Sequence, residues 1–151
     1  MRRIWHFTKT VIGIIFRHPV PGTSIIARMP DDRIVLIRRR DNGLWGLPGG
    51  MVDWGETVPT VVERELLEET GLTLVRIRRL VGVYSDPDRD PRIHSVCCVV
   101  EVEAEGEMRV TDPMEVLDVK AFHPHEMPEG RYSHDHRRQL DDYLAGQTTL
   151  A

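Results

Sequence analysis

The sequence predicts an α/β fold in which a mixed β-sheet packs against helices, and two observations lead to this class. Apolar segments of strand length lie on both sides of one central helical segment, and a second helical segment follows near the end of the chain. This order of elements is typical of a mixed α/β sandwich. The 151 residues, 40% hydrophobic and 29% charged, have the size and composition of one domain, so we expect residues 1–151 to form a single domain.

Residues 1–19 begin with positive charge and include one unbroken apolar run, Val11 to Phe16. The run is too short for the core of a signal peptide or for a membrane span. We therefore expect an N-terminal segment that packs on the domain or contributes to a homodimer interface, rather than one that lies on a membrane surface.

The first two strands are expected at residues 23–28 and 34–39, on either side of a turn that contains Pro30. Because proline and aspartates between two apolar runs are typical of a turn, these strands are expected to form a hairpin. Three later segments complete the predicted sheet, at residues 74–84, 93–102 and 116–122. The second of these three is apolar enough to be a buried strand.

The central helix is expected to run from Thr57, a suitable N-cap, to about Thr70. Gly71 is a suitable C-terminal stop, since glycine adopts the left-handed conformation that ends many helices. A second helix is expected to begin near Ser133 and to end before Gly146.

The net charge of −4 gives no electrostatic reason to expect nucleic-acid or membrane binding. Cys97 and Cys98 are adjacent in a predicted strand, where neighbouring side chains point to opposite faces and do not easily form a disulfide. This cysteine usage is typical of a reducing cytoplasm, so we expect a cytoplasmic protein whose partners are small molecules.

The central helix carries an unusual density of carboxylates. At about 100° per residue, Glu68 and Glu69 lie within about 60° of Glu65 and share one face with it. By the same arithmetic, this face also carries three valines, Val58, Val61 and Val62. The carboxylates are therefore expected to point toward the protein rather than into open water.

Partly desolvated carboxylates of like charge raise each other's pKa values or repel, unless a cation neutralises them. Mg²⁺ or Mn²⁺, which take carboxylate oxygens and keep bound waters, fit this role. The alternative is a solvated acidic face. A helix-loop-helix calcium site is disfavoured, because no stretch carries the aspartate-rich loop with its terminal glutamate.

The segment Gly50-x5-Glu56-x7-Arg64-Glu65-Leu66-x-Glu68-Glu69-x-Gly71-Leu72 resembles the Nudix box at every defined position. The preceding Trp45-Gly46-Leu47-Pro48-Gly49 is similar to the usual approach to this box, and the resemblance covers roughly residues 20–130. It implies a Nudix-type α/β/α sandwich with a mixed β-sheet and a hydrolase that cuts phosphate anhydrides.

The resemblance also implies the roles of individual residues. The metal, Mg²⁺ or Mn²⁺, is expected to be held by Gly49 through its carbonyl and by the carboxylates of Glu65, Glu68 and Glu69. Glu56 and Arg64 are expected to pair and to hold the loop onto the helix. The metal would polarise the pyrophosphate and lower the pKa of an attacking water.

A catalytic base is still needed, and relatives place such a glutamate on a loop outside the box. The corresponding candidate is Glu115, and a box glutamate such as Glu68 is the alternative. Three further glutamates stay open as candidates, Glu101, Glu103 and Glu126.

The substrate is indicated by the segment from Tyr84 to His94, which resembles a loop of ADP-ribose pyrophosphatases. Those enzymes are also marked by a proline at a set distance beyond the box, and Pro87 stands fifteen residues after Leu72. The leading hypothesis is therefore hydrolysis of ADP-ribose, or of a related nucleotide sugar, to a nucleoside monophosphate and a sugar phosphate.

Five residues are candidates for substrate binding. Arg89 and Arg92 are suited to a phosphate or the terminal sugar, or they are solvated charges of a rigid loop. Tyr84 either stacks on a base or packs against a neighbouring strand. Strand alternation places Arg38 and Arg40 on one face, directed either to the substrate phosphates or to solvent.

Other conspicuous side chains are expected to have no role in catalysis. A group of histidines is expected to be solvated rather than to bind zinc, because no supporting cysteine pair is present: His123, His125, His134 and His136. Two tryptophans, Trp45 and Trp54, flank the loop that contains Gly49 and Gly50 (the glycine loop), and they are expected to pack rather than to stack on a base.

Two other functions stay open at this stage. One is a nucleoside triphosphate pyrophosphohydrolase that removes damaged nucleotides. The other is a non-catalytic Nudix module that senses a ligand, although the box is intact and no basic recognition face accompanies it.

Overall fold

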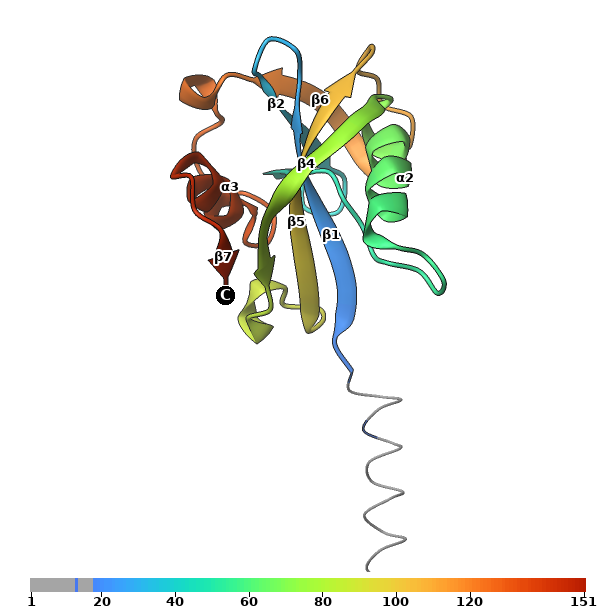
Figure 1. The fold of residues 1–151 in the computed structure, drawn as a ribbon, viewed down its shortest axis with the longest axis vertical. Coiled ribbons are helices and arrows are strands. Elements are labelled where there is room, and N and C mark those ends of the chain that lie inside the picture. Colours follow the sequence, from blue (N-terminus) through green and yellow to red (C-terminus); the bar gives the residue numbers. More distant parts are fainter. Residues whose placement is uncertain (1–12, 14–17) are drawn as a thin grey trace, which may run out of the picture.

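The computed structural model describes residue 13 and residues 18–151 (Figure 1). The predicted packing or dimerisation role of residues 1–19 falls almost entirely outside these residues. The strands are β1 (Val20–Arg28), β2 (Ile34–Arg39), β3 (Trp45–Gly46), β4 (Thr73–Tyr84), β5 (Ser95–Glu105), β6 (Val116–Phe122) and β7 (Thr149–Leu150). The helices are α2 (Val58–Thr70), α3 (His136–Leu144) and two short 3₁₀ turns, η1 (Pro87–Arg89) and η2 (Pro124–Glu126).

The strands form one mixed sheet. Its order is β3-β2-β1-β5-β4-β7, and β6 also pairs with β2. The predicted hairpin of β1 and β2 is confirmed, because the two strands pair antiparallel. The centre of the sheet is parallel, since β1 and β5 pair from Val20 with Ser95 to Arg28 with Glu103.

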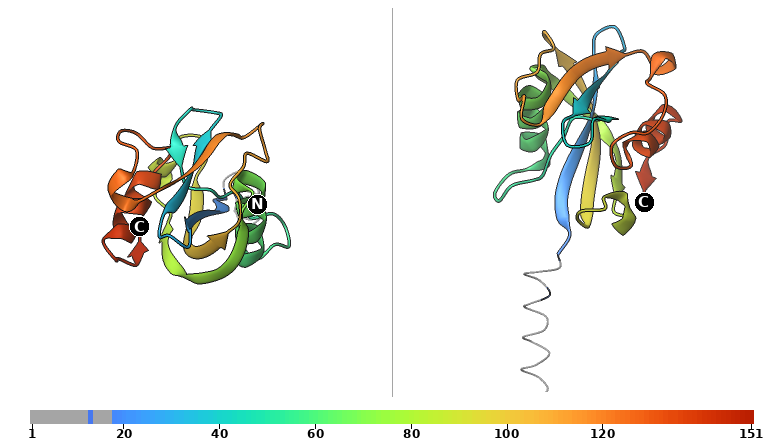
Figure 2. Two further views of the ribbon diagram at one scale, coloured as in Figure 1. Left: turned by 90° about the horizontal axis from the view of Figure 1, so that it is seen from above. Right: turned by 180° about the vertical axis from the view of Figure 1, so that it is seen from behind.

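The two helices cover opposite sides of the sheet (Figures 1 and 2). Strand alternation along β1 explains the two cores: Ile26 packs in the cluster that contains Leu140 of α3, whereas Ile25 packs in the cluster that contains Val62 and Leu66 of α2. The predicted α/β/α sandwich with a mixed sheet is therefore confirmed.

Local sequence signals set the ends of α2 as predicted. The Thr57 side chain accepts a hydrogen bond from the Thr60 backbone N–H, and Gly71 adopts φ 74° while its N–H donates to the Leu67 carbonyl. The buried face of the helix carries Val61 and Val62 together with two carboxylates, Glu65 and Glu69. The apolar and acidic residues thus share one face, as their spacing predicts.

The start of α3 was placed too early by the sequence. The helix begins at His136, three residues after the predicted start at Ser133. The reason is His134, whose φ of 51° lies in the left-handed region and cannot continue a right-handed helix. No helix among the described residues is long and apolar enough to cross a membrane.

Candidate active site

A cavity of about 470 Å³ lies where the first half of β1, the glycine loop after β3 and the buried face of α2 meet the start of β5 and the segment before α3. Its walls include residues of the segment that resembles the Nudix box and residues of the segment from Tyr84 to His94, which was expected to contact the substrate. The lining residues that matter most for the chemistry are Arg39, Gly49, Gly50, Glu65, Arg89, Asp90, Arg92, Glu115, His134 and His136.

Glu69 and Glu65 are the buried carboxylates of α2. Glu69 is 2% exposed, and its Oε2 accepts a hydrogen bond of 2.8 Å from the Gly49 backbone N–H. Burial is the main cause that raises the pKa of Glu69 to about 8, and the negative charges of Glu65 and Glu115 add to it. Burial also raises the pKa of Glu65, against the opposing effect of Arg64.

The absence of a side chain at Gly50 allows the Glu65 carboxylate to lie against the loop. A Cβ atom at position 50 would lie 2.0 Å from Glu65 Oε1, so only a glycine leaves room for this carboxylate against the loop. The Gly50 backbone and the Glu65 carboxylate are therefore so close that no side chain fits between them.

Arg64 joins the loop to the helix. Its Nε and Nη2 donate to the two oxygens of Glu56, each at 2.9 Å, so the structure brings together the two residues that we expected to pair. Nη1 of Arg64 also donates to Glu65 at 2.8 Å and to Glu68 at 3.2 Å. The Glu68 side chain is 55% exposed, at the open side of this cluster.

The donor set fits a hard divalent cation. Carboxylate oxygens are the ligands that Mg²⁺ and Mn²⁺ prefer, and two of the three carboxylates are buried with raised pKa values, so a nearby cation would favour their ionised form. In the part of the chain that the structure describes, no three His, Cys, Asp or Glu side chains already converge as a cation cage. Instead, Glu65 and Glu68 accept hydrogen bonds from Arg64, and Glu69 accepts one from the Gly49 backbone N–H.

Among the candidate bases, only Glu115 lines the same cavity as Glu65. Its negative charge is close enough to contribute to the raised pKa values of Glu65 and Glu69. Glu126 is exposed in η2, Glu101 and Glu103 line a different cavity, and Glu68 is exposed beside Arg64.

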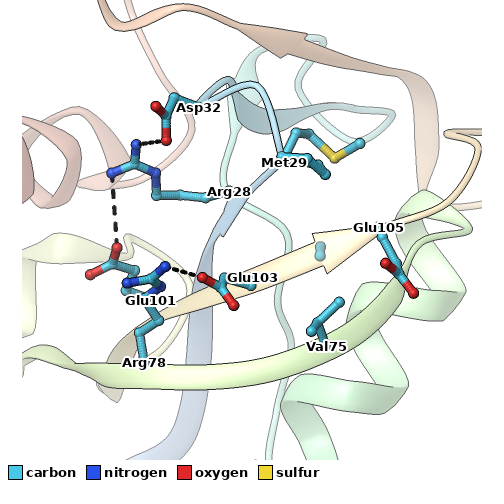
Figure 3. Close-up of a pocket in the computed structure, with 10 residues that line it drawn as sticks. Arg28, Met29, Asp32, Val75, Arg78, Glu101, Glu103 and Glu105 are labelled. Atoms are coloured by element: carbon cyan, nitrogen blue, oxygen red, sulfur yellow. Dashed lines mark hydrogen bonds and ion pairs between the residues drawn. The ribbon is translucent and has the colours of Figure 1, made fainter.

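This second cavity, of about 430 Å³, lies between the β1–β2 turn and the strands β4 and β5 (Figure 3). Apart from Glu105, its charges are paired internally: Arg28 contacts Asp32, and Arg78 contacts Glu103. Glu101 accepts hydrogen bonds from Arg79 and from the Tyr143 hydroxyl, both at 3.0 Å. Because these ion pairs leave little uncompensated charge, the cavity beside α2 is the better candidate for chemistry.

The structure does not bring Arg38 and Arg40 to the active-site cavity. Arg38 Nε donates to the Gly43 carbonyl at 3.0 Å, and Arg40 Nε donates to the Pro113 carbonyl at 2.7 Å. Arg39, which sequence reasoning missed, lines the cavity instead. Strand alternation correctly separates Arg39 from its neighbours, but the sequence does not show which face of β2 meets the cavity.

Tyr84 is a core residue. It is 1% exposed, and its hydroxyl donates a hydrogen bond of 2.8 Å to Asp142 Oδ2 in α3. Of the two interpretations of Tyr84, packing is therefore the one that the structure supports, and the side chain is not available to stack on a base.

Arg89 and Arg92 line the cavity, but both are already engaged by carboxylates. Arg89 forms a two-point contact with Asp135, at 3.1 and 2.8 Å, and its side chain is only 6% exposed. Arg92 contacts Asp90 and Asp41 and is 54% exposed. Arg89 therefore fixes the loop after β4 to the start of α3, whereas Arg92 retains an exposed surface.

We expect the Arg89→Ala variant to lose about 3 kcal/mol of the free energy of unfolding, because it removes a buried guanidinium and leaves the partly buried Asp135 carboxylate without its charged partner. The matched control is Arg137→Ala, which removes an exposed pair with Asp141 and should change stability by less than about 1 kcal/mol. Urea unfolding of both variants measures the difference. An Arg89→Ala protein of normal stability but raised KM would instead assign this side chain to the substrate.

The histidines were wrongly expected to be solvated as a group. His136 is 6% exposed, and its Nδ1 accepts a hydrogen bond of 2.9 Å from the Leu47 backbone N–H. His134 lines the cavity with it, at 5.5 Å between ring centroids. The exposed His125 fits the expectation, and its ring stacks on that of His123.

The two tryptophans differ in environment. Trp45 packs edge-on against Phe122, with ring centroids 5.3 Å apart, as expected for a packing residue. Trp54 is fully exposed, so the expectation that it packs is wrong for the chain as described.

An α/β/α sandwich with buried carboxylates on one helix, packed against a glycine-containing loop, is the arrangement expected of a hydrolase of phosphate anhydrides. The chain belongs to the Nudix family, because the NUDIX domain profile matches residues 18–143.

The relatives include several activities. The chain is 37% identical over 134 residues to an ADP-ribose pyrophosphatase of Methanocaldococcus jannaschii, which covers 86% of this chain and 76% of the relative. It is 30% identical over 125 residues to a putative 8-oxo-dGTP diphosphatase of Bacillus subtilis, covering 83% of this chain and 80% of the relative. Relatives with different named substrates therefore belong to the same family, so family membership alone does not identify the substrate.

Solved structures agree on the fold. A MutT NUDIX hydrolase from Burkholderia pseudomallei matches with a TM-score of 0.73 and 35% identity, over 83% of this chain and 98% of that one. The NUDIX domain of Shewanella oneidensis NrtR, solved with ADP ribose, matches with a TM-score of 0.77 and 22% identity, over 88% and 91% of the two chains.

Proposed function

We propose that the protein hydrolyses the phosphate anhydride of a nucleoside diphosphate sugar, ADP-ribose or a close relative, to a nucleoside monophosphate and a sugar phosphate. The observation that carries this proposal is the continuity of one cavity from Glu65 on α2 to Asp90 and Arg92 on the loop after β4. A substrate with a pyrophosphate at one end of this cavity has room for a further group at the other. The similarity to the Methanocaldococcus jannaschii enzyme supports the same substrate class.

In this proposal the carbonyl of Gly49 and the carboxylates of Glu65, Glu68 and Glu69 hold Mg²⁺ or Mn²⁺. The bound ion would neutralise the pyrophosphate and lower the pKa of a water molecule. Glu115 is the proposed base, because its carboxylate lines the cavity and is not held by an ion pair in the part of the chain that the structure describes. Glu68 is the alternative base.

The phosphates also need positive charge from the protein. Arg39 and Arg92 line the cavity, and each donates to Asp41, so the two guanidinium groups are held near one another. We propose that they contact phosphate oxygens, for which the planar guanidinium is well suited.

The second candidate function is hydrolysis of nucleoside triphosphates, and the similarity to the putative 8-oxo-dGTP diphosphatase favours it. Both candidates use the same carboxylates. They differ in what occupies the far end of the cavity, a sugar in the first and a base or nucleoside in the second.

The described cysteines, Cys97 and Cys98, are both free thiols. This supports the proposal that the protein works in a reducing compartment such as the cytoplasm. A homodimer that includes residues 1–19 stays a proposal.

The test is hydrolysis of a substrate panel with Mg²⁺ and with Mn²⁺: ADP-ribose, other nucleotide sugars, dinucleoside polyphosphates, NADH and nucleoside triphosphates. We expect ADP-ribose or another nucleotide sugar to have the highest kcat/KM, with AMP as the product of ADP-ribose. Preference for triphosphates would overturn the substrate while keeping the site. Absence of hydrolysis with either metal would favour a ligand-sensing module.

A further inference from the structure

His134 is held in an unusual backbone conformation inside the active-site cavity. Its φ of 51° lies in the left-handed region, which residues other than glycine seldom adopt. Its neighbours fix it there, since Ser133 N–H donates to the Trp45 carbonyl and Asp135 binds Arg89. The side chain lines the cavity and is 13% exposed. This conformation sets the ring into the wall of the cavity.

The hydrogen bond from Arg92 determines the protonation state of the His134 ring. Nη2 of Arg92 lies 3.2 Å from Nε2 of His134. Because a guanidinium can only donate, Nε2 must accept, and it therefore carries no proton. The ring is then neutral, and its single N–H is on Nδ1. Burial, which lowers the pKa of His134, favours the same neutral form.

The Nδ1–H group has no hydrogen-bond partner among the described residues. The carboxylate oxygen recorded beside it is Asp90 Oδ2, at 3.7 Å, which is too far for a hydrogen bond. Asp90 accepts from the Arg92 backbone N–H and side chain at 2.9 to 3.1 Å, and its own side chain is only 8% exposed. Burial alone would raise the pKa of Asp90, but the hydrogen bonds from Arg92 hold it at about 2, so the carboxylate is ionised.

An unpaired donor and an ionised acceptor thus lie 3.7 Å apart in the wall of the cavity. A hydroxyl group has both functions that this pair needs, because it can accept from an N–H and donate to a carboxylate at the same time. A phosphate oxygen can only accept, and the negative charge of Asp90 would repel it.

We propose that His134 and Asp90 bind a sugar hydroxyl of the substrate. This hydroxyl accepts a hydrogen bond from Nδ1–H of His134 and donates one to Oδ2 of Asp90. This inference rests on the proposed function and deepens it, because it names the group that separates a nucleotide sugar from other anhydrides. The hydroxyl belongs either to the terminal sugar or to the ribose of the nucleoside, and the two sources share this chemistry.

The first experiment uses His134→Gly, which removes the ring but retains a residue that adopts positive φ without strain. We expect KM for ADP-ribose to rise about tenfold with kcat within about twofold of wild type, as for the loss of one hydrogen bond in the ground state and transition state alike. His134→Asn, which tolerates the same backbone conformation and carries an N–H donor, should recover most of the affinity. His125→Gly, at an exposed histidine outside the cavity, is the matched control and should leave both constants unchanged.

Competitive inhibitors then separate the possible sources of the effect. Inorganic pyrophosphate contains no sugar and therefore no sugar hydroxyl, so its inhibition constant should be the same in wild type and His134→Gly. ADP retains the nucleoside ribose but lacks the terminal sugar. A raised inhibition constant for ADP therefore assigns the hydroxyl to the nucleoside, and an unchanged one assigns it to the terminal sugar.

Two results would overturn the inference alone: an unchanged KM for ADP-ribose in His134→Gly, or an equal weakening of pyrophosphate, which would show that the ring only holds the loop. A wild-type enzyme that cleaves no nucleotide sugar would overturn both the proposed function and this inference. That result is visible without any variant, so the two failures are distinguishable.

Discussion

Replacement of Glu69 by glutamine is expected to lower kcat/KM by about 100-fold or more with either metal, while the protein stays folded. A metal ion contributes several kcal/mol to transition-state stabilisation, and each 1.4 kcal/mol is about a factor of ten in rate. The glutamine matches the shape of the buried side chain, and its amide oxygen can still accept from the Gly49 N–H. Only the negative charge that a cation needs is removed.

The control for Glu69→Gln is Glu63→Gln, which removes the same charge from an exposed position on the same helix. This variant should retain wild-type activity and metal affinity. Mn²⁺ binding followed by electron paramagnetic resonance, with urea unfolding in parallel, separates loss of metal from loss of fold. Near-normal turnover in a folded Glu69→Gln protein would refute the metal assignment.

Features of the site that depend on local sequence were predictable. The 3.6-residue period places Glu65 and Glu69 on the face that carries Val61 and Val62, and the structure buries all four together. The caps at Thr57 and Gly71 form for the same reason, because a cap depends only on residues within one helical turn. Such contacts need no knowledge of the tertiary fold.

Features that depend on distant partners were not predictable. Arg89 looked like a phosphate ligand, but Asp135 reaches it from the start of α3, 46 positions later in the chain. Arg39 was missed because alternation separates the two faces of β2 without showing which of them meets the cavity. Residue type and spacing alone do not identify which partner a long side chain will find.

The histidines before α3 show a further limit. The pattern His134-Asp135-His136 indicates a solvated helix start, whereas the structure buries His136 beneath the loop that leads to Gly49. The left-handed conformation of His134 ends the preceding segment and turns its ring into the cavity wall. No local signal marks this conformation, because it is imposed by the contacts of Ser133 and Asp135 on either side.

The second large effect is expected at Gly50, where alanine should lower kcat/KM by about 10- to 100-fold without unfolding the protein. The new Cβ would lie 2.0 Å from Glu65 Oε1 and 2.4 Å from Glu65 Cδ. The obstructing atoms are the end of a flexible side chain, so the carboxylate can move away while the backbone stays in place. We expect the free energy of unfolding to change by about 1 kcal/mol or less.

Gly49→Ala is the informative comparison, because a side chain at this neighbouring position should lower stability, whereas one at Gly50 should lower activity. Gly49 has φ 145°, and a Cβ there would lie 2.2 Å from the Thr23 carbonyl oxygen, a backbone atom that cannot rotate away. We expect this variant to lose about 3 kcal/mol of stability, which urea unfolding measures. If Gly50→Ala instead kept both its stability and its activity, the displaced Glu65 carboxylate would not need its position against the loop. Its assignment as a metal ligand would then be wrong, because a ligand displaced by an added methyl group cannot leave metal-dependent turnover unchanged.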